Sequence, residues 1–148
     1  MFSIIEKVIF LQDVDIFKHI TSEDLSHIAA ITVEENIEEG GVIYEEGDVS
    51  DSMYMVIEGN VRLHVGESLV MIAELKDVFG AWSLFDDEVR LISATAFKDC
   101  RLLKIEKSHM LELLADNVSI TEGILKAMAK RLHGIARKIG ADFDKVQE

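Results

Sequence analysis

The stretch MYMVIEGNVRLHV, residues 53–65, decides the fold class of this chain. Its first five residues are apolar or aromatic, and Gly59 lies in the polar break that follows them. The last five residues alternate, so that Val61, Leu63 and Val65 share one face of an extended chain. Glycine accommodates the positive φ that many tight turns require. The stretch therefore predicts two consecutive β-strands joined by a short turn.

Similar patterns extend this β region in both directions. Further short strands are expected at 32–37, 42–44, 69–73, 92–97 and 100–105. Seven or eight short strands with regularly spaced turns indicate a sandwich or a barrel. Apolar residues recur at helical spacing on both sides of the β region. The expected organisation is a single domain over residues 1–148, with N-terminal helices in 1–31, a β roll in 32–106 and C-terminal helices in 107–148.

The charge of the chain is strongly negative and unevenly distributed. The formal net charge is −13 over 148 residues. Residues 1–97 hold 5 basic and 20 acidic side chains, or −15, whereas residues 98–148 hold 10 and 8, or +2. Binding to nucleic acid or to an anionic membrane surface requires a basic footprint, which most of the chain lacks. We therefore expect no nucleic-acid partner and no direct membrane insertion.

The cellular compartment is predicted from one cysteine and from the N-terminus. Cys100 is the only cysteine, so no internal disulfide can form, and its apolar neighbours indicate a small core residue. The apolar N-terminus is interrupted by Glu6 and Lys7 and has no basic leader. No apolar stretch has the length that a bilayer-spanning helix needs. These features predict a cytoplasmic protein.

Several short motifs occur in a distinctive order. They are GGVIYEEGD at 40–48, MYMVIEGNV at 53–61, Phe79-Gly80, Arg90, and LLKI at 102–105. In this order and spacing they resemble the cyclic-nucleotide-binding domain family. The resemblance implies a mainly β fold with flanking helices, namely a jelly-roll-like β barrel (double-stranded β-helix) with N-terminal helices and a long C-terminal helix. It also implies a regulatory sensor, not an enzyme.

Residues 79–93, FGAWSLFDDEVRLIS, correspond to the ligand cassette of that family. The resemblance implies that backbone N–H groups at the start of a short helix bind a cyclic phosphate, as in cAMP or cGMP. Arg90 would pair with the same phosphate through its planar fork. The ligand-binding residues implied are Phe79, Gly80, Ala81, Trp82, Ser83, Arg90, Leu91 and Ile92.

The cassette also departs from the family pattern. Ala81 stands where the family has a glutamate that accepts a hydrogen bond from the ribose 2′-hydroxyl, and Trp82 stands where a smaller aliphatic residue is usual. Val89 replaces a proline, while Leu91 and Ile92 replace small residues. A hydrogen bond to a charged group contributes about 1.5–3 kcal/mol, so its loss weakens binding roughly ten- to hundredfold. We therefore predict weak binding of cAMP, cGMP or a related small phosphate.

Two alternatives follow from these departures. Arg90 either recognises a phosphate or forms an internal salt bridge with the acidic run at 86–88. The chain is accordingly either a cyclic-nucleotide sensor or a ligand-free protein-interaction or dimerisation module with the same fold. Arg90 and Phe79-Gly80 favour the sensor, whereas Ala81 and Leu91 favour the interaction module.

Other kinds of chemistry find no support in the sequence. The five histidines are scattered and have no metal-ligand spacing. Ser83 does not lie in a nucleophile elbow, and there is no glycine-rich phosphate loop of the nucleotide-hydrolase or dinucleotide-binding type. We therefore expect no catalytic residue, no metal and no cofactor.

The C-terminal helix carries an apolar seam. The seam consists of Leu125, Met128, Leu132, Ile135 and Ile139, which step alternately by three and four residues, and it is interrupted at Asp142. It predicts a homodimer through this helix, with Gly134 near the crossing point. The same stripe is also compatible with packing against the protein's own barrel. No recognition-helix pattern follows the seam within these residues, so we expect no direct contact with DNA.

Overall fold

The computed structural model describes residues 1–147, and for Ser83 and residues 142–147 only the backbone is considered. These residues include eight strands in two four-stranded antiparallel sheets. One sheet has the order β1-β8-β3-β6, formed by Thr32–Ile37, Cys100–Glu106, Ser52–Glu58 and Val78–Phe79. The other has the order β2-β7-β4-β5, formed by Val42–Tyr44, Ser93–Ala96, Val61–Val65 and Ser68–Ala73.

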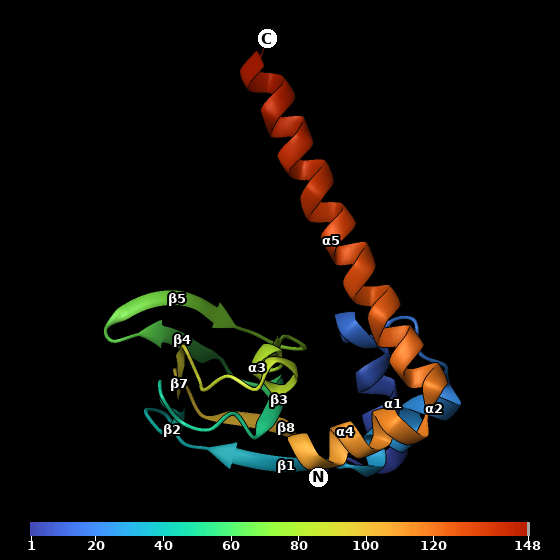
Figure 1. The fold of residues 1–148 in the computed structure, drawn as a ribbon. Coiled ribbons are helices and arrows are strands. Elements are labelled where there is room, and N and C mark those ends of the chain that lie inside the picture. The colour runs from blue at the N-terminus through green and yellow to red at the C-terminus, as the bar shows by residue number, and fades with distance from the viewer. Residues whose placement is uncertain (148) are drawn as a thin grey trace.

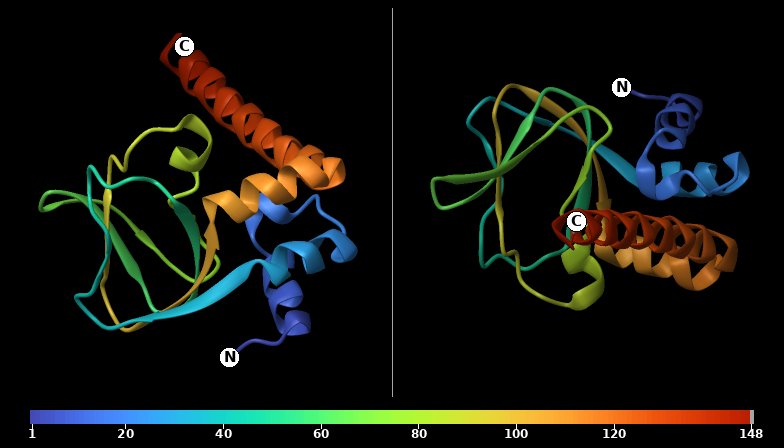
Figure 2. Two further views of the ribbon diagram at one scale, coloured as in Figure 1. Left: turned by 60° about the horizontal axis from the view of Figure 1, so that its bottom comes forward. Right: turned by 90° about the horizontal axis from the view of Figure 1, so that it is seen from above.

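Helices occupy both ends of the chain and the cassette. They are α1 (Ile4–Gln12), the 3-10 helix η1 (Asp15–Phe17), α2 (Ser22–Ala30), α3 (Trp82–Asp86), α4 (Lys107–Asp116) and α5 (Val118–Gln147). Figure 1 shows α1, α2 and α4 gathered beside one end of the β region, with α5 extending from them. In Figure 2, α3 lies on the side of the β region that faces α5. Among residues 1–147, no helix combines the length and the apolar character needed to cross a membrane.

Strand β3 is the centre of the fold because both of its faces are buried. Met53, Met55 and Ile57 pack into the core that includes the N-terminal helices, α4 and the start of α5. Tyr54 and Val56 point the other way, into a core between the two sheets. A strand covered on both faces needs apolar side chains at every position, which explains the unbroken apolar run. Each such side chain contributes about 1.5–3 kcal/mol when fully buried.

Helices α1 and α2 begin where polar side chains can cap their N-termini. Ser3 caps α1 by accepting a hydrogen bond from the backbone of Glu6, whose carboxylate accepts one from the Ser3 backbone in return. Thr21 caps α2 through the Asp24 backbone at 3.2 Å. Such caps satisfy N–H groups that have no partner within the helix. They fix the point at which the N-terminal helices turn onto β3 and β8.

The sequence-based fold prediction is confirmed. Strands β1, β2 and β4 have the predicted bounds. Strands β3 and β7 differ from the prediction by one residue at both ends, and β5 and β8 differ by one residue at one end. Only the two-residue strand β6 was not predicted. Cys100 is buried, as expected of a small core residue. That residues 1–148 form a single domain stays a prediction.

Candidate anion-binding cavity

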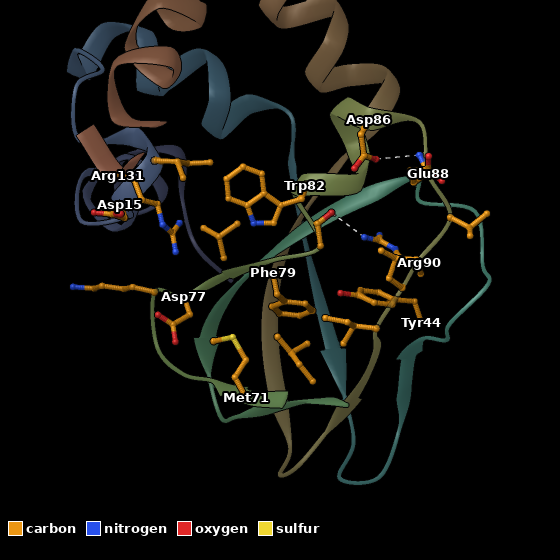
Figure 3. Close-up of a pocket in the computed structure, with 18 residues that line it drawn as sticks. Asp15, Tyr44, Met71, Asp77, Phe79, Trp82, Asp86, Glu88, Arg90 and Arg131 are labelled. Carbon is orange, nitrogen blue, oxygen red and sulfur yellow. Dashed lines mark hydrogen bonds between the residues drawn. The ribbon is translucent and has the colours of Figure 1, made fainter. Parts of the chain in front are cut away.

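A cavity of about 620 Å³ lies where the β region meets the cassette and α5. Its strand residues include Tyr44, Leu63 and Met71, and α5 contributes Arg131. The cassette contributes Phe79, Gly80, Trp82, Arg90, Leu91 and Ile92. Figure 3 shows Arg90 and Tyr44 on one wall and Trp82 and Arg131 toward the other. The cavity therefore brings together six of the eight residues that the resemblance implied.

Arg90 is the buried cation of this cavity. Only 3% of its surface is exposed. Its Nη1 donates to the carbonyl oxygen of Gly80 at 2.8 Å, and its Nη2 donates to the carbonyl oxygen of Ser52. The guanidinium carbon lies 3.9 Å from the centre of the Tyr44 ring. All three of these partners are electrically neutral, and together they orient the guanidinium.

The backbone of Arg90 is tied to the loop between β2 and β3. Its N–H donates to the carbonyl of Asp48 at 2.9 Å, and its own carbonyl accepts from Gly47 at 2.8 Å. Val89 and Val49 form an isolated antiparallel bridge beside these bonds. The GGVIYEEGD motif therefore holds the end of the cassette in place. This explains why two motifs far apart in sequence occur together.

Gly80 is required by the position of Arg90. The residue has a φ of +78°, which side chains other than glycine rarely adopt. A Cβ at this position would lie 2.7 Å from Nη1 of Arg90 and 3.4 Å from the carbonyl oxygen of Ser52. Only a residue without a side chain leaves room for the guanidinium here. Glycine is thus required at position 80 both by the positive φ and by the space that the Arg90 guanidinium occupies.

The acidic run near Arg90 makes other contacts. Asp87 accepts a hydrogen bond from Nζ of Lys107 at 2.9 Å, and this contact lowers the pKa of the Asp87 carboxyl. Asp86 accepts from the backbone N–H of Glu88 at 3.0 Å. The contacts described for Asp86 and Asp87 therefore give no support to an internal salt bridge with Arg90. Asp86 and Glu88 instead lie on the cavity lining and make its rim acidic.

The remaining cassette residues differ in their relation to the cavity. Trp82 is 60% exposed at the rim, and the guanidinium carbon of Arg131 lies 6.0 Å from its ring. Leu91 is 73% exposed. Ala81 is half-buried and lines an adjoining hollow of about 60 Å³ between α3 and α5, not the large cavity. The side chain of Ser83 lies outside the described residues.

Tyr44 and Arg131 are among the cavity residues that sequence reasoning missed. Tyr44 lies in a quoted motif but was interpreted only as part of a strand. The register of β2 against β7 shifts between Val42 and Tyr44, and such an irregularity re-aims a side chain. Val42 is exposed whereas Tyr44 is buried. For Arg131, the only indication in the sequence was that a basic residue lies beside the apolar seam, which is too weak to predict a place in the cavity.

The apolar seam of α5 is largely uncovered. Leu125, Leu132, Ile135 and Ile139 are each more than half exposed, and Met128 packs at the edge of the helical core. The start of α5 is anchored by Ile120 and Ile124, which are buried. The four exposed residues therefore do not pack against the barrel of their own chain. The prediction of a homodimer stays a prediction.

Among the side chains that the structure describes, no group of three or more His, Cys, Asp or Glu residues could hold a metal ion. His64 on β4 has both ring nitrogens in contact with ordinary partners, the Gly66 carbonyl at 2.7 Å and the Thr95 hydroxyl at 2.8 Å. This histidine is thereby fixed within its sheet. It is not grouped with other residues that bind metals.

Known proteins resemble this chain in sequence. The family model described as "Cyclic nucleotide-binding domain" matches residues 34–117. A CRP-like cAMP-activated global transcriptional regulator of Mycobacterium tuberculosis is 30% identical over 115 residues, which cover 72% of this chain and 51% of the relative. A cAMP-dependent protein kinase regulatory subunit of Hypocrea atroviridis is 29% identical over 117 residues, or 79% of this chain and 24% of the relative. The chain thus spans about half the length, or less, of these curated relatives.

Solved structures resemble the chain in fold. The N-terminal domain of a transcriptional regulator from Streptomyces coelicolor has a TM-score of 0.79 at 24% identity, covering 88% of this chain and 94% of its own. The Thermus thermophilus catabolite activator protein has a TM-score of 0.69 at 22% identity, covering 86% and 62%.

The two relatives described above are regulatory proteins. Enzymes also match over small parts of their length, namely a cAMP/cGMP phosphodiesterase of Dictyostelium discoideum over 10% and a lysophospholipase of Neosartorya fischeri over 7%. Because transcriptional regulators are among the similar proteins, the comparisons give no support to the expectation that nucleic acid is not a partner. The family model covers more than half of the chain. This chain belongs to the cyclic nucleotide-binding domain family.

Proposed function

We propose that this chain is a regulatory domain that binds cAMP or cGMP weakly, with Arg90 contacting the cyclic phosphate. The observation that carries this proposal is the buried guanidinium on the wall of a cavity of about 620 Å³. Pockets for small ligands usually have a volume of about 300–1,000 Å³. Family membership supports a cyclic-nucleotide-sensing role.

The cavity suits an anion that carries an apolar body. Leu63, Met71 and Ile92 supply apolar surface to pack against a base and a sugar, and Arg90 supplies the positive charge. A guanidinium in a site of low dielectric constant interacts more strongly with an anion than it does in water. Its planar donors also match the oxygens of a phosphate. We infer that the phosphate lies beside Arg90 and the base lies toward Trp82.

Three features keep the proposed affinity low. Ala81 offers no side-chain acceptor for a ribose hydroxyl. Two of the five N–H groups of Arg90 already donate to backbone carbonyls, so fewer donors remain for a phosphate. Among the described residues, the lining holds four acidic side chains against the three basic ones of Lys76, Arg90 and Arg131, so its positive charge is more than balanced. The acidic residues are Asp15, Asp77, Asp86 and Glu88.

We also propose that α5 mediates a homodimer. Four of the five seam residues are largely exposed in the single chain, and each apolar side chain contributes about 1.5–3 kcal/mol when it is fully buried. A second copy of α5 presents the same seam and covers it symmetrically. The helix lies in the part of the chain whose net charge is only +2, so two copies approach there with little repulsion.

Calorimetric titration with cAMP and cGMP tests the nucleotide proposal. We expect dissociation constants in the high micromolar range, as the roughly ten- to hundredfold penalty for the missing acceptor implies. Arg90→Lys keeps the charge but removes the planar fork, and it should weaken binding by about tenfold or more. Arg101→Lys is the matched control, because Arg101 pairs with Glu34 and does not line the cavity. Adenosine, which lacks the phosphate, should not bind measurably.

The alternative function predicts different outcomes of the same titration. A folded wild-type protein that binds neither nucleotide at millimolar concentration would point to a ligand-free interaction module. The largely exposed Leu91 and the exposed seam of α5 are the observations that favour this alternative. Submicromolar binding would instead show that the missing acceptor at Ala81 matters less than its chemistry suggests. Trp82, the only tryptophan, provides an independent fluorescence readout at the cavity rim.

A further inference from the structure

The closest packing partner described for the Arg90 guanidinium is an aromatic ring from another strand. Tyr44 on β2 presents the face of its ring to Arg90, with 3.9 Å between the ring centre and the guanidinium carbon. Both residues are at least nine-tenths buried and both line the large cavity. Figure 3 shows the two side chains stacked on the same wall. The contact is therefore part of the cavity itself.

The ring is held rigidly by its own neighbours. Tyr44 packs beside Tyr54 and Phe79, with ring centres 6.1 Å and 6.2 Å away, and Tyr54 stacks on Phe79 at 5.3 Å. Fixed aromatic rings of this kind have little freedom to rotate within a packed core. The Tyr44 ring consequently offers Arg90 a surface of fixed orientation.

Ring and carbonyls restrain different motions of the guanidinium. A cation over an aromatic face is attracted to the ring and lies close to it, which sets the plane of the group. The carbonyls of Gly80 and Ser52 accept hydrogen bonds in definite directions, which sets its rotation within that plane. Together the three contacts define one orientation. Without the ring, the carbonyl contacts restrain the tilt of the group less strongly.

The ring also stays neutral over the pH range in which proteins are studied. Burial raises the pKa of Tyr44 to about 12, although the nearby charge of Arg90 acts in the opposite direction. A phenolate would neutralise the guanidinium and compete with an anionic ligand. A neutral ring attracts the cation without removing the charge that a phosphate would recognise.

We propose that Tyr44 is a positioning residue of the anion site, whose ring holds the Arg90 guanidinium in the orientation that receives the phosphate. This inference rests on the proposed function, because it names a residue that serves the same cavity. Tyr44 acts through Arg90 and need not touch the ligand. Its aromatic face, and not its hydroxyl, is the feature that matters.

Three variants separate positioning from general packing. Tyr44→Phe keeps the ring face, whereas Tyr44→Leu removes it and leaves an apolar side chain. Tyr54→Leu is the matched control, since it disturbs the same aromatic cluster but does not remove the ring beneath Arg90. The first readout is the NMR signal of the Arg90 side chain, which the ring current of Tyr44 displaces. The second is the affinity for cAMP, measured by calorimetry.

We expect Tyr44→Phe to keep both the displaced Arg90 signal and the wild-type affinity. Tyr44→Leu should lose the displacement and bind cAMP about two- to thirtyfold more weakly, the range that cation–π interactions span. Tyr54→Leu should lower the thermal stability but loosen Tyr44 only partly, because Phe79 still packs beside the ring. It should therefore keep most of the displaced Arg90 signal and lose less affinity than Tyr44→Leu does.

Two results would overturn the proposal. One is a Tyr44→Leu variant that keeps the Arg90 signal and the affinity of the wild type. The other is a Tyr54→Leu variant that loses affinity as much as Tyr44→Leu does, because general loosening of the core would then explain both. If the wild type binds neither cAMP nor cGMP, the proposed function fails. The Arg90 signal then decides alone whether Tyr44 positions the guanidinium.

Discussion

Adding one methyl group at Gly80 should damage the anion site by displacing Arg90. Gly80→Ala places a Cβ 2.7 Å from Nη1 of Arg90 and 3.4 Å from the carbonyl oxygen of Ser52. Real Cβ atoms do not approach a neighbour that closely, so the guanidinium or the Gly80 backbone has to move. Either movement breaks the 2.8 Å hydrogen bond from Nη1 to the Gly80 carbonyl. The structure therefore predicts a loss of both stability and nucleotide affinity.

The magnitude is the sum of two effects. A residue with a side chain at a φ of +78° is strained by about 1–2 kcal/mol. Loss of a hydrogen bond from a charged donor costs about 1.5–3 kcal/mol. We therefore expect Gly80→Ala to lower the free energy of unfolding by about 2.5–5 kcal/mol. Gly40→Ala is the matched control, because Gly40 has a similar φ of +83° and no atom within 4 Å of the added Cβ.

Urea unfolding of the wild type, Gly80→Ala and Gly40→Ala measures the loss of stability. Calorimetry with cAMP measures the loss of affinity. Gly40→Ala should cost only the strain, about 1–2 kcal/mol, and leave the affinity unchanged. Gly80→Ala should cost more and reduce the affinity by about tenfold or more. Equal destabilisation by the two substitutions, together with wild-type affinity for Gly80→Ala, would refute the idea that Gly80 makes room for Arg90.

Two further predictions concern the cassette and α5. Ala81→Glu supplies the missing acceptor and should strengthen cAMP binding by about ten- to hundredfold. It should also lower stability by about 1–3 kcal/mol, because Ala81 lines the apolar hollow beside α5. An unchanged affinity would show that the missing acceptor does not set the strength of binding. Ile135→Glu should yield a folded monomer by light scattering and circular dichroism, whereas Arg137→Glu, off the seam, should stay dimeric. A monomeric wild type at high concentration would refute the dimer, and unfolding of Ile135→Glu would assign the seam to the core.

Strands β3 and β4 could be predicted because each obeys a simple burial pattern. Val61 and Leu63 alternate with half-exposed residues on β4, as a strand with one covered face requires. Strand β3 lacks alternation because helices cover one face and the second sheet covers the other. Its length and its flanking turn nevertheless distinguished it from a helix. Strand β6 could not be predicted, since Val78–Phe79 is too short to show any period.

The site was predictable only in part. The motif order pointed to Phe79, Gly80 and Arg90, which do meet at the cavity. The contact of Tyr44 with Arg90 depends on a register shift between Val42 and Tyr44, and nothing in the local sequence announces such a shift.

The contacts of the acidic residues at 86–88 could not be predicted from the sequence either. Proximity in sequence suggested that the run at 86–88 pairs with Arg90. Asp87 is bonded to Lys107, a residue at the start of α4 whose proximity the local sequence did not indicate. Contacts between distant elements depend on the packed fold, which local patterns do not specify.

Helix α5 joins the cavity to the proposed dimer seam through adjacent residues. Arg131 lines the cavity, and Leu132, the next residue, belongs to the exposed seam. A partner helix that covers Leu132 necessarily restricts the backbone that carries Arg131. If a ligand contacts Arg131 more favourably in one position of α5 than in another, binding of the ligand changes the affinity of α5 for the partner helix. Linkage then requires the partner to change the affinity for the ligand by the same factor. If both proposals hold and the ligand contacts Arg131 in this way, nucleotide titrations above and below the dimer dissociation constant should therefore differ.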